Sequence, residues 1–349
     1  MKTKTTLLLP VIVLPLLAFS SREDKVAFAP SAGATAAKEM NLTATLYLDD
    51  MRMVVDGNEM PAEMMGEAMD EGLLIDMTIG VTDEYAKTED GRPVQLLRTY
   101  DVLSMEAGPE SESESVDEFG EMEDMTISFS WDEDTEEYVK SVVGDDEGDA
   151  DLLENLEVDM DFLALLPTEE VSEGDTWEAK GDAIGTVFLP GGMPASSDVD
   201  EEGMDEIQSL FESTLEEQLG DSFEDFAIQC TYKGSSEDEG VNVGAIEFRF
   251  EGDMEMDMSD MIQEVISMQA GDADFDASMT ALIMGEFEGE GTLLWNLDAG
   301  HMHAFEMEGD LVLTLDVEGD IDAMGESHSL EMSLEASGEL AYDMSSSPE

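Results

Sequence analysis

The chain is poor in basic residues. Its 349 residues include 13 Lys and Arg against 88 Asp and Glu, which gives a formal net charge of −75. Nucleic acids and anionic membrane surfaces bind through clusters of Lys and Arg, so this shortage excludes both as partners. Most carboxylates must face solvent, because few of them can find a cation. Cations, cationic polymers or a saline medium suit such a surface.

The chain also lacks an apolar run long enough to span a membrane as a helix, which takes roughly 20 residues. The run over residues 7–17 is shorter, contains two prolines, follows two lysines and precedes a small-residue cleavage motif before Ser21. This order is typical of an export signal. We therefore expect a signal peptide over residues 1–20 and a soluble mature protein in the periplasm or outside the cell.

Cys230 is the only cysteine, so no internal disulfide can stabilise the fold. It alternates with Phe226, Ile228 and Tyr232, which predicts a small core residue. No Gly-x-Ser-x-Gly elbow, glycine-rich phosphate loop or His-Glu-x-x-His helix occurs. Among so many carboxylates, spacing alone cannot select an acid–base pair. We expect a protein that is not an enzyme, with no catalytic residue and no cofactor.

Alternating apolar and polar residues dominate the rest of the chain. The alternation is clear over residues 41–48, 73–81, 125–131, 246–258, 311–317 and 330–342. Ile246, Phe248 and Phe250, for example, alternate with Glu247, Arg249 and Glu251. One apolar and one acidic face per strand is typical of an antiparallel sheet that is dry on one side.

Helices and loops are the minority. Residues 205–219 predict an amphipathic helix, because their Ile, Leu and Phe residues form one stripe. Residues 151–160 fit a short helix and, nearly as well, a strand. Residues 106–124 are acidic and serine-rich, which predicts an exposed loop.

These patterns predict a flexible leader over residues 21–38, a single β-rich body over 39–344 and a short tail over 345–349. The apolar strand faces must be closed from water. We expect a mainly β fold, a large curved antiparallel sheet or open half-barrel with one to three short helices. The 205–219 helix would lie in its concavity and cover the apolar faces. Two β lobes are the alternative. An outer-membrane barrel is disfavoured, because its lumen would be lined by uncompensated carboxylates.

Two acidic segments resemble parts of calcium-binding loops. Asp272, Asp274 and Asp276 begin like an EF-hand loop, but Ala277 and Ile283 stand where that loop needs Gly and Glu. The second segment, with Asp198, Asp200, Glu202 and Gly203, ends in Ser209 at the last ligand position. Both are partial matches of the kind that an acid-rich chain produces by chance, and the metal ligands stay unassigned.

Methionine is abundant, with 27 residues, and Met254, Met256 and Met258 resemble a copper(I) motif. They continue the apolar face of Phe248 and Phe250, so we interpret them as core residues of a strand.

Two of the three histidines, His301 and His303, bracket Met302. A hairpin with a three-residue loop ending at Gly300 would place Leu293 opposite Phe305 and Trp295 opposite His303, with Met302 on the other face. The third histidine, His328, would lie opposite Glu318 and far along the sheet. The sequence therefore predicts no joint three-histidine site; a site formed by His301, His303 and a carboxylate is the weaker alternative.

One segment carries a family resemblance. Leu166, Pro167, Val171, Gly174, Asp175 and Trp177 form the pattern LP-x-x-x-V-x-x-GD-x-W, which resembles an uncharacterised family of exported, β-rich bacterial proteins. The later segment over residues 289–311 is part of the same resemblance, which covers about the last half of the chain and implies fold and export but no activity. The residues themselves predict a stop at Pro167, a strand start at Val171, a tight turn at Gly174 and an anchor at Trp177.

Three hypotheses for function follow. The first is an exported, non-enzymatic protein that binds a partner through its acidic surface. The second is a carrier that holds an apolar ligand, a lipid or lipoprotein acyl chain, in a concave sheet. The third is a protein whose fold needs calcium or high salt.

Overall fold

The computed structural model describes residues 23–60, 72–89, 91–109, 113–116, 122–144, 151–153, 155–179, 183–192, 226–259, 261–263, 275–323 and 326–348. The expected signal peptide, the 205–219 helix and the 198–209 motif lie outside these residues. So do Asp272 and Asp274, whereas Asp276 lies in a strand.

All strands in the described residues belong to one sheet. They are β1 (Ala34–Val55), β2 (Asn58–Glu59), β3 (Leu73–Glu89), β4 (Arg92–Pro109), β5 (Glu114–Val116), β6 (Thr126–Asp132), β7 (Glu137–Val142), β8 (Thr176–Ala179), β9 (Ala227–Asp238), β10 (Val241–Asp257), β11 (Phe275–Asn296), β12 (His301–Ala323) and β13 (Glu326–Pro348). Within the described chain the helices are short: α1 (Ala183–Phe188) and the 3-10 turns η3 (Asp151–Leu153) and η4 (Leu163–Leu165). None of these helices is long and apolar enough to cross a membrane.

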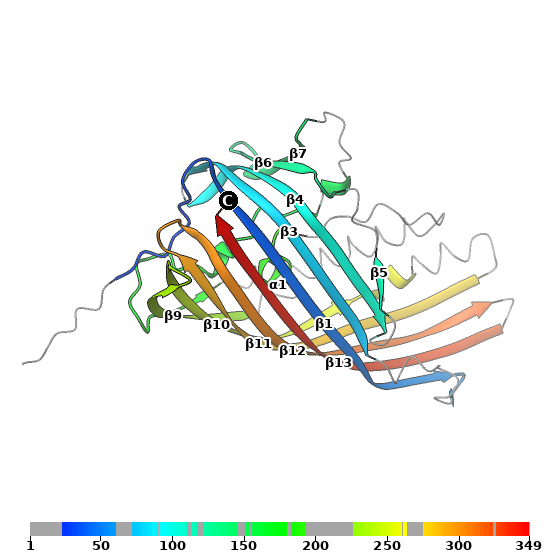
Figure 1. Ribbon diagram of the computed structural model, residues 1–349. Coiled ribbons are helices and arrows are strands. Elements are labelled where there is room, and N and C mark those ends of the chain that lie inside the picture. Colours follow the sequence, from blue (N-terminus) through cyan, green and yellow to red (C-terminus); the bar gives the residue numbers. More distant parts are fainter. Residues whose placement is uncertain are drawn as a thin grey trace, which may run out of the picture.

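The sheet is antiparallel and open. Its order is β7-β6-β4-β3-β1-β13-β12-β11-β10-β9-β8, with β2 on β1 and β5 on β4, and the end strands β7 and β8 are not paired with each other (Figure 1). The first long strand, β1, pairs along most of its length with the last, β13. The two halves of the chain therefore form one curved sheet, as predicted, and not two lobes.

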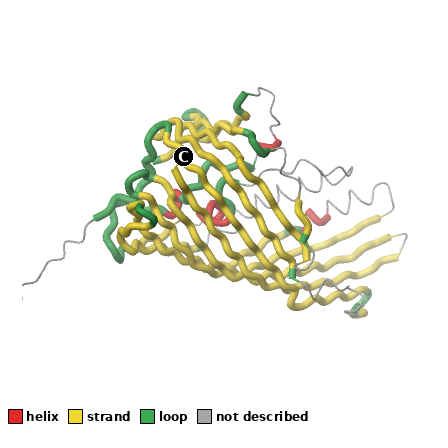
Figure 2. Tube along the Cα trace, in the orientation of Figure 1, coloured by secondary structure: helices red, strands yellow, loops and turns green. Residues whose placement is uncertain are grey.

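Glycines in β11 let aromatic rings lie close to the strand. A Cβ atom on Gly289 would come within 2.3 Å of Phe250 Cζ, and one on Gly291 within 2.3 Å of Phe248 Cζ. Any larger residue would push these rings off the inner face. The sheet curves strongly, and loops and helices lie inside the curve (Figure 2).

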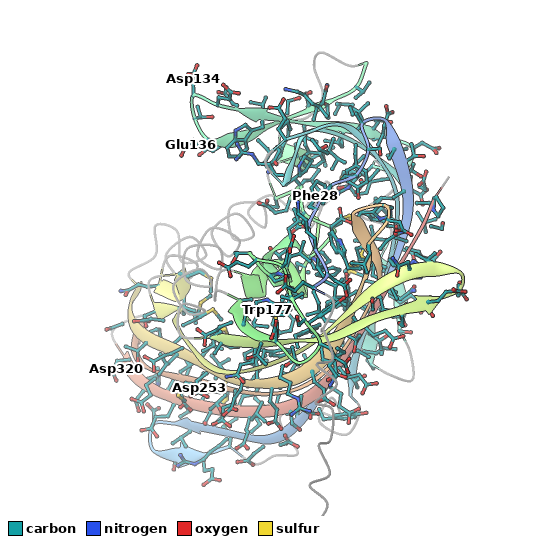
Figure 3. All side chains as sticks on the ribbon, turned by 90° about the vertical axis from the view of Figure 1, so that its left-hand side faces the viewer. Phe28, Asp134, Glu136, Trp177, Asp253 and Asp320 are labelled. Atoms are coloured by element: carbon teal, nitrogen blue, oxygen red, sulfur yellow. The ribbon has the colours of Figure 1, made fainter. Side chains whose placement is uncertain are left out.

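The chain itself fills the inner face at one end of the sheet. Phe162 stacks on Phe305 with ring centroids 3.8 Å apart, and Phe28 and Trp177 lie within the curve (Figure 3). A second apolar cluster lies further along the same strands, with Met254, Met256, Met258, Met279, Ala281 and Val317 at its centre. Met254 and Met256 in β10 and Met258 just after it are 6%, 4% and 1% exposed, so their prediction as core residues is confirmed.

Several expected boundaries were wrong. The expected leader is packed from Asp24 onward, with Val26 and Phe28 buried, and β1 already begins at Ala34. Its alternation was hidden because small alanines and one lysine occupy the inner face. The expected 106–124 loop contains the end of β4 and all of β5, and β13 continues to Pro348 through most of the expected tail.

Residues 151–160 are neither the expected helix nor a strand. They contain the single turn η3 and one isolated bridge, from Leu156 to Gly192. Their leucines face the core as a helical stripe would, but Asp159 accepts a backbone N–H bond and Asp161, just beyond the segment, accepts the Tyr85 hydroxyl. We call residues 157–165 the inner segment.

Candidate functional site

Four charged residues are buried together between the sheet and the inner segment. Lys38 comes from β1, Asp83 from β3, Arg98 from β4 and Asp161 from the inner segment. Their exposed fractions are 2%, 0%, 0% and 4%. We call this group the ionic cluster.

Asp83 is the centre of the ionic cluster. Arg98 donates from Nε to Asp83 Oδ1 (2.7 Å) and from Nη2 to Asp83 Oδ2 (3.0 Å). Lys38 Nζ lies 2.9 Å from Asp83 Oδ2 and 3.0 Å from Asp161 Oδ2. Two cations therefore meet two carboxylates, and the charges balance where water cannot solvate them.

Neighbouring donors and acceptors complete the ionic cluster. Tyr85 donates its hydroxyl to Asp161 Oδ2 (2.7 Å), and the backbone N–H of Met302 donates to Asp161 Oδ1 (3.2 Å). Arg98 also donates to the carbonyl oxygens of Glu157 (2.9 Å) and Val158 (3.0 Å). These bonds join the inner segment to three strands at once.

The protonation states follow from these partners. Burial alone would raise the pKa of Asp83, but Arg98 and Lys38 outweigh burial and hold it at about 2. Burial alone would lower the pKa of Lys38, but Asp161 and Asp83 raise it above its ordinary value. Lys38 is therefore an ammonium and Asp83 a carboxylate at neutral pH.

A third carboxylate, Asp159, lies at the rim of the ionic cluster and is partly exposed. It accepts backbone N–H bonds from Asp161 and Leu163, both 2.8 Å long. Burial and then the neighbouring Asp161 raise its pKa to about 6.

The sequence predicted none of these residues as special. Lys38 lies in the expected leader, and Asp83 and Arg98 lie outside the expected strands. A signal existed, since Asp83 continues the buried period-two face of Ile79 and Val81 in β3. A charged residue on an apolar face needs a buried partner.

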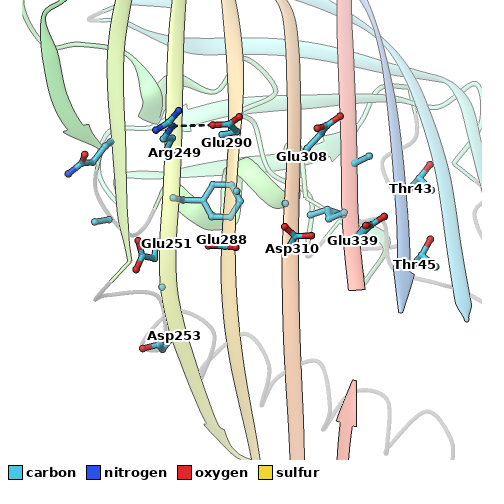
Figure 4. Close-up of a pocket in the computed structure, with 18 residues that line it drawn as sticks. Thr43, Thr45, Arg249, Glu251, Asp253, Glu288, Glu290, Glu308, Asp310 and Glu339 are labelled. Atoms are coloured by element: carbon cyan, nitrogen blue, oxygen red, sulfur yellow. Dashed lines mark ion pairs between the residues drawn. The ribbon is translucent and has the colours of Figure 1, made fainter. Parts of the chain in front are cut away.

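The opposite, outer face of the sheet carries rows of carboxylates. Glu251, Glu288, Asp310 and Glu339 lie directly opposite one another in β10, β11, β12 and β13. All four are exposed. We call them the acidic row; they point to the same side of the sheet in Figure 4.

The acidic row lines a hollow of about 1280 Å³. Glu290, Glu308 and Asp253 add further carboxylates to its lining. Among the described residues that line this hollow, Arg249 is the one cation, and it is paired with Glu290 at 3.1 Å. Like charges placed directly opposite in neighbouring strands repel each other, so the acidic row favours any cation that can lie across it.

The hairpin that holds His301 and His303 differs from its prediction near the turn. Leu293 pairs with Phe305 as predicted, but the register shifts between Leu294 and Trp295, so Trp295 pairs with Met302 and not with His303. This bulge turns Met302 into the core, where it is 0% exposed. Gly300 takes the predicted left-handed conformation, with φ of +74°.

The three histidines have separate partners. His301 Nδ1 contacts the Met302 carbonyl oxygen (2.7 Å), His303 Nε2 contacts Asp238 (3.1 Å) and His328 Nδ1 contacts Asp56 (2.8 Å). The predicted partner of His328 was wrong, because His328 pairs with Ile321 and not with Glu318. Within the described chain, no three His, Cys, Asp or Glu residues are placed to hold a metal ion.

The segment with the LP-x-x-x-V-x-x-GD-x-W pattern forms a turn and anchors a strand to the core. Gly174 takes a left-handed φ of +93°, and Asp175 accepts the Ser172 N–H in the same turn. Trp177 donates its indole N–H to the Leu165 carbonyl oxygen (3.1 Å). Val171 makes only an isolated bridge with Asp24, so the predicted strand begins later, at Thr176.

Cys230 is the core residue that the alternation predicted. It is 0% exposed, and burial raises the pKa of its thiol to about 12. A thiol of this kind is neither nucleophilic nor a metal ligand at neutral pH.

Comparison with known proteins identifies no relative for this chain. No family model matches, and no curated protein matches. Solved structures with weak similarity include a mutant of Rh. blastica porin, at 9% identity and a TM-score of 0.17 over 90% of this chain and 100% of that one. Pseudomonas aeruginosa OccK8 (OprE) follows at 6% identity and a TM-score of 0.15, over 91% and 100%. Likeness this weak bears on neither fold nor function.

Proposed function

We propose that this protein is an exported, non-enzymatic binding protein whose outer sheet face holds a cationic ligand, such as a polyamine or a Lys-rich chain. The observation that carries the proposal is the acidic row, with four carboxylates opposed across four strands and one paired cation beside them. The balanced ionic cluster shows that this fold can pair its charges where burial requires it.

The geometry favours an extended polycation over a single ion. Neighbouring strands lie about 4.8 Å apart, so the acidic row presents regularly spaced charges over three strand intervals. A chain with several ammonium groups can contact several of these carboxylates at once. One ordered metal ion would need its ligands to converge, and an extended row does not converge.

Titration calorimetry with pentalysine at low ionic strength tests the proposal. The variant Glu288→Gln, Asp310→Asn, Glu339→Gln should bind at least about tenfold more weakly, since each exposed ion contact contributes up to ~1 kcal/mol. The matched control changes Glu133, Asp134 and Glu137, three exposed acids at the β6–β7 hairpin, to their amides. Equal loss in both variants would mean that net charge alone attracts the peptide, and would contradict a site at the acidic row.

A second candidate is a carrier of an apolar ligand. The methionine-rich cluster on the inner face supports it, because methionine adapts its shape to irregular ligands. Native mass spectrometry of the purified protein tests it: a retained lipid supports the carrier, and a lipid-free protein that binds pentalysine supports the first proposal.

A further inference from the structure

We propose that Lys38 and Asp161 condense to form an amide bond between Lys38 Nζ and Asp161 Cγ, which cross-links β1 to the inner segment. Lys38 Nζ lies 3.0 Å from Asp161 Oδ2, and both side chains are almost completely buried. Two groups held in contact in a dry site have effective concentrations on the order of 10⁵ M or more, and condensation between an amine and a carboxyl group gains from this.

The surrounding groups are placed to assist each step. Asp83 Oδ2 lies 2.9 Å from Lys38 Nζ and can stabilise the positive charge that develops on the nitrogen during attack. The Met302 N–H donates to Asp161 Oδ1, where negative charge would develop during attack. Tyr85 donates its hydroxyl to Asp161 Oδ2, the oxygen that leaves.

The condensation begins from the ion pair. One proton moves from the Lys38 ammonium to Asp161 Oδ2, which leaves a neutral amine and a carboxylic acid. The nitrogen lone pair then forms a bond to Cγ, and the C=O π electrons move to Oδ1. One of the two protons on the nitrogen passes directly to the Oδ2 hydroxyl, while Asp83 accepts a hydrogen bond from the other N–H. The Cγ–Oδ2 bond breaks, the C=O bond to Oδ1 re-forms, and one water molecule leaves; Asp83 stays a carboxylate throughout.

Asp161 is the acceptor rather than Asp83. Arg98 holds both oxygens of Asp83, and its charge keeps that carboxyl group ionised. An ionised carboxylate resists attack by an amine. Asp161 has no guanidinium partner among the contacts of the described residues, and its oxygens meet only a hydroxyl, a backbone N–H and the Lys38 ammonium.

The product keeps the polar contacts satisfied. The new amide N–H can donate to Asp83, and the amide oxygen can accept the Met302 N–H. Asp83 and Arg98 remain as a balanced pair. The bond removes one buried ion pair, whose desolvation opposes folding, and it supplies the covalent link that a chain with a single cysteine cannot make.

The mass of the purified full-length chain after denaturation tests the proposal. We expect it to be lower, by the mass of one water molecule, than the mass of the sequence whose N-terminus is read from a peptide map. Tryptic digestion should leave the bond after Lys38 uncut and yield one branched peptide that joins Lys38 to Asp161. A chain with the full sequence mass and ordinary cleavage after Lys38 would overturn the proposal, and this measurement needs no variant to fold.

Variants locate the bond. Lys38→Met and Asp161→Ala should have the full mass of their sequences, and Asp83→Asn should form the link more slowly after refolding. Lys233→Met is the matched control, because Lys233 Nζ lies 2.7 Å from Glu247 in an exposed pair that water solvates. It should retain the loss of water. If Lys38→Met also lost water, the link would be elsewhere and the proposal would be wrong.

Discussion

Replacing Arg98 with Met tests whether the ionic cluster stabilises the fold. Arg98 is 0% exposed and makes two bonds to Asp83 and two to backbone carbonyls of the inner segment. Met fills most of the volume of the arginine stem but leaves the Asp83 carboxylate without its guanidinium. The change thus isolates the loss of a buried charge partner.

The expected cost follows from what remains around Asp83. Removing one partner of a buried ion pair costs about 3–5 kcal/mol. Asp83 keeps a hydrogen-bond donor at Lys38 Nζ, 2.9 Å away, either as the ammonium or as the N–H of the proposed amide. This contact favours the lower part of the range, so we expect a loss of about 3–4 kcal/mol in the free energy of unfolding.

Urea unfolding followed by tryptophan fluorescence gives this value, from the shift in midpoint at an unchanged slope. Arg249→Met, which breaks the exposed Arg249–Glu290 pair, should cost less than about 1 kcal/mol. The double variant Asp83→Leu, Arg98→Met should be more stable than the sum of the single changes predicts, because it removes both charges together. A cost for Arg98→Met no larger than that for Arg249→Met, or strict additivity, would refute the role given to the ionic cluster.

The remaining predictions concern pH, the thiol and salt. The folded pKa of Asp159, about 6, lies above its unfolded value near 3.8. Its contribution therefore makes the free energy of unfolding fall as pH rises from about 4 to 6. Asp159→Asn should flatten this part of the curve of urea midpoint against pH, and an unchanged curve would contradict the raised pKa. Asp83, with a folded pKa of about 2, acts in the opposite sense, and its contribution should be lost as pH falls below about 4. Cys230 should not react with a thiol reagent at mildly alkaline pH until urea unfolds the chain; fast reaction of the folded protein would mean that its strand opens. Sodium chloride should raise the urea midpoint, and it should do so less in the variant Glu288→Gln, Glu339→Gln. The loss of unfolding free energy caused by Arg98→Met should not change with salt, because buried charges are screened little.

The faces of β10 could be predicted because the outward residues Glu247, Arg249 and Glu251 are charged. In β10, Ile246, Phe248 and Phe250 are buried and the residues between them are exposed, as their alternation indicated. A period of two with a strong polarity difference allows only one orientation of a strand in a one-sided sheet. Export, partners and the lack of catalysis stay predictions.

The ionic cluster could not be predicted in the same way, because it depends on contacts between distant segments. Lys38 and Asp161 are brought together only when the inner segment folds onto β1. The bulge beside Trp295 is similar, since a single extra residue in one strand leaves no trace in the apolar pattern. Local periodicity fixes which face a side chain takes, and tertiary packing decides which residues meet on that face.

The two faces of this sheet treat charge in opposite ways. On the inner face each charge of the ionic cluster has an opposite charge within about 3 Å, since a dry site makes an unpaired charge prohibitive. On the outer face the acidic row places like charges in neighbouring strands about 4.8 Å apart. This spacing is shorter than the Debye length of about 8 Å at physiological ionic strength, so diffuse salt screens the acidic row only in part. A cationic chain lying across the row would neutralise it more completely than salt does. Binding and folding stability are then linked, because a ligand that binds only the folded sheet raises the free energy of unfolding.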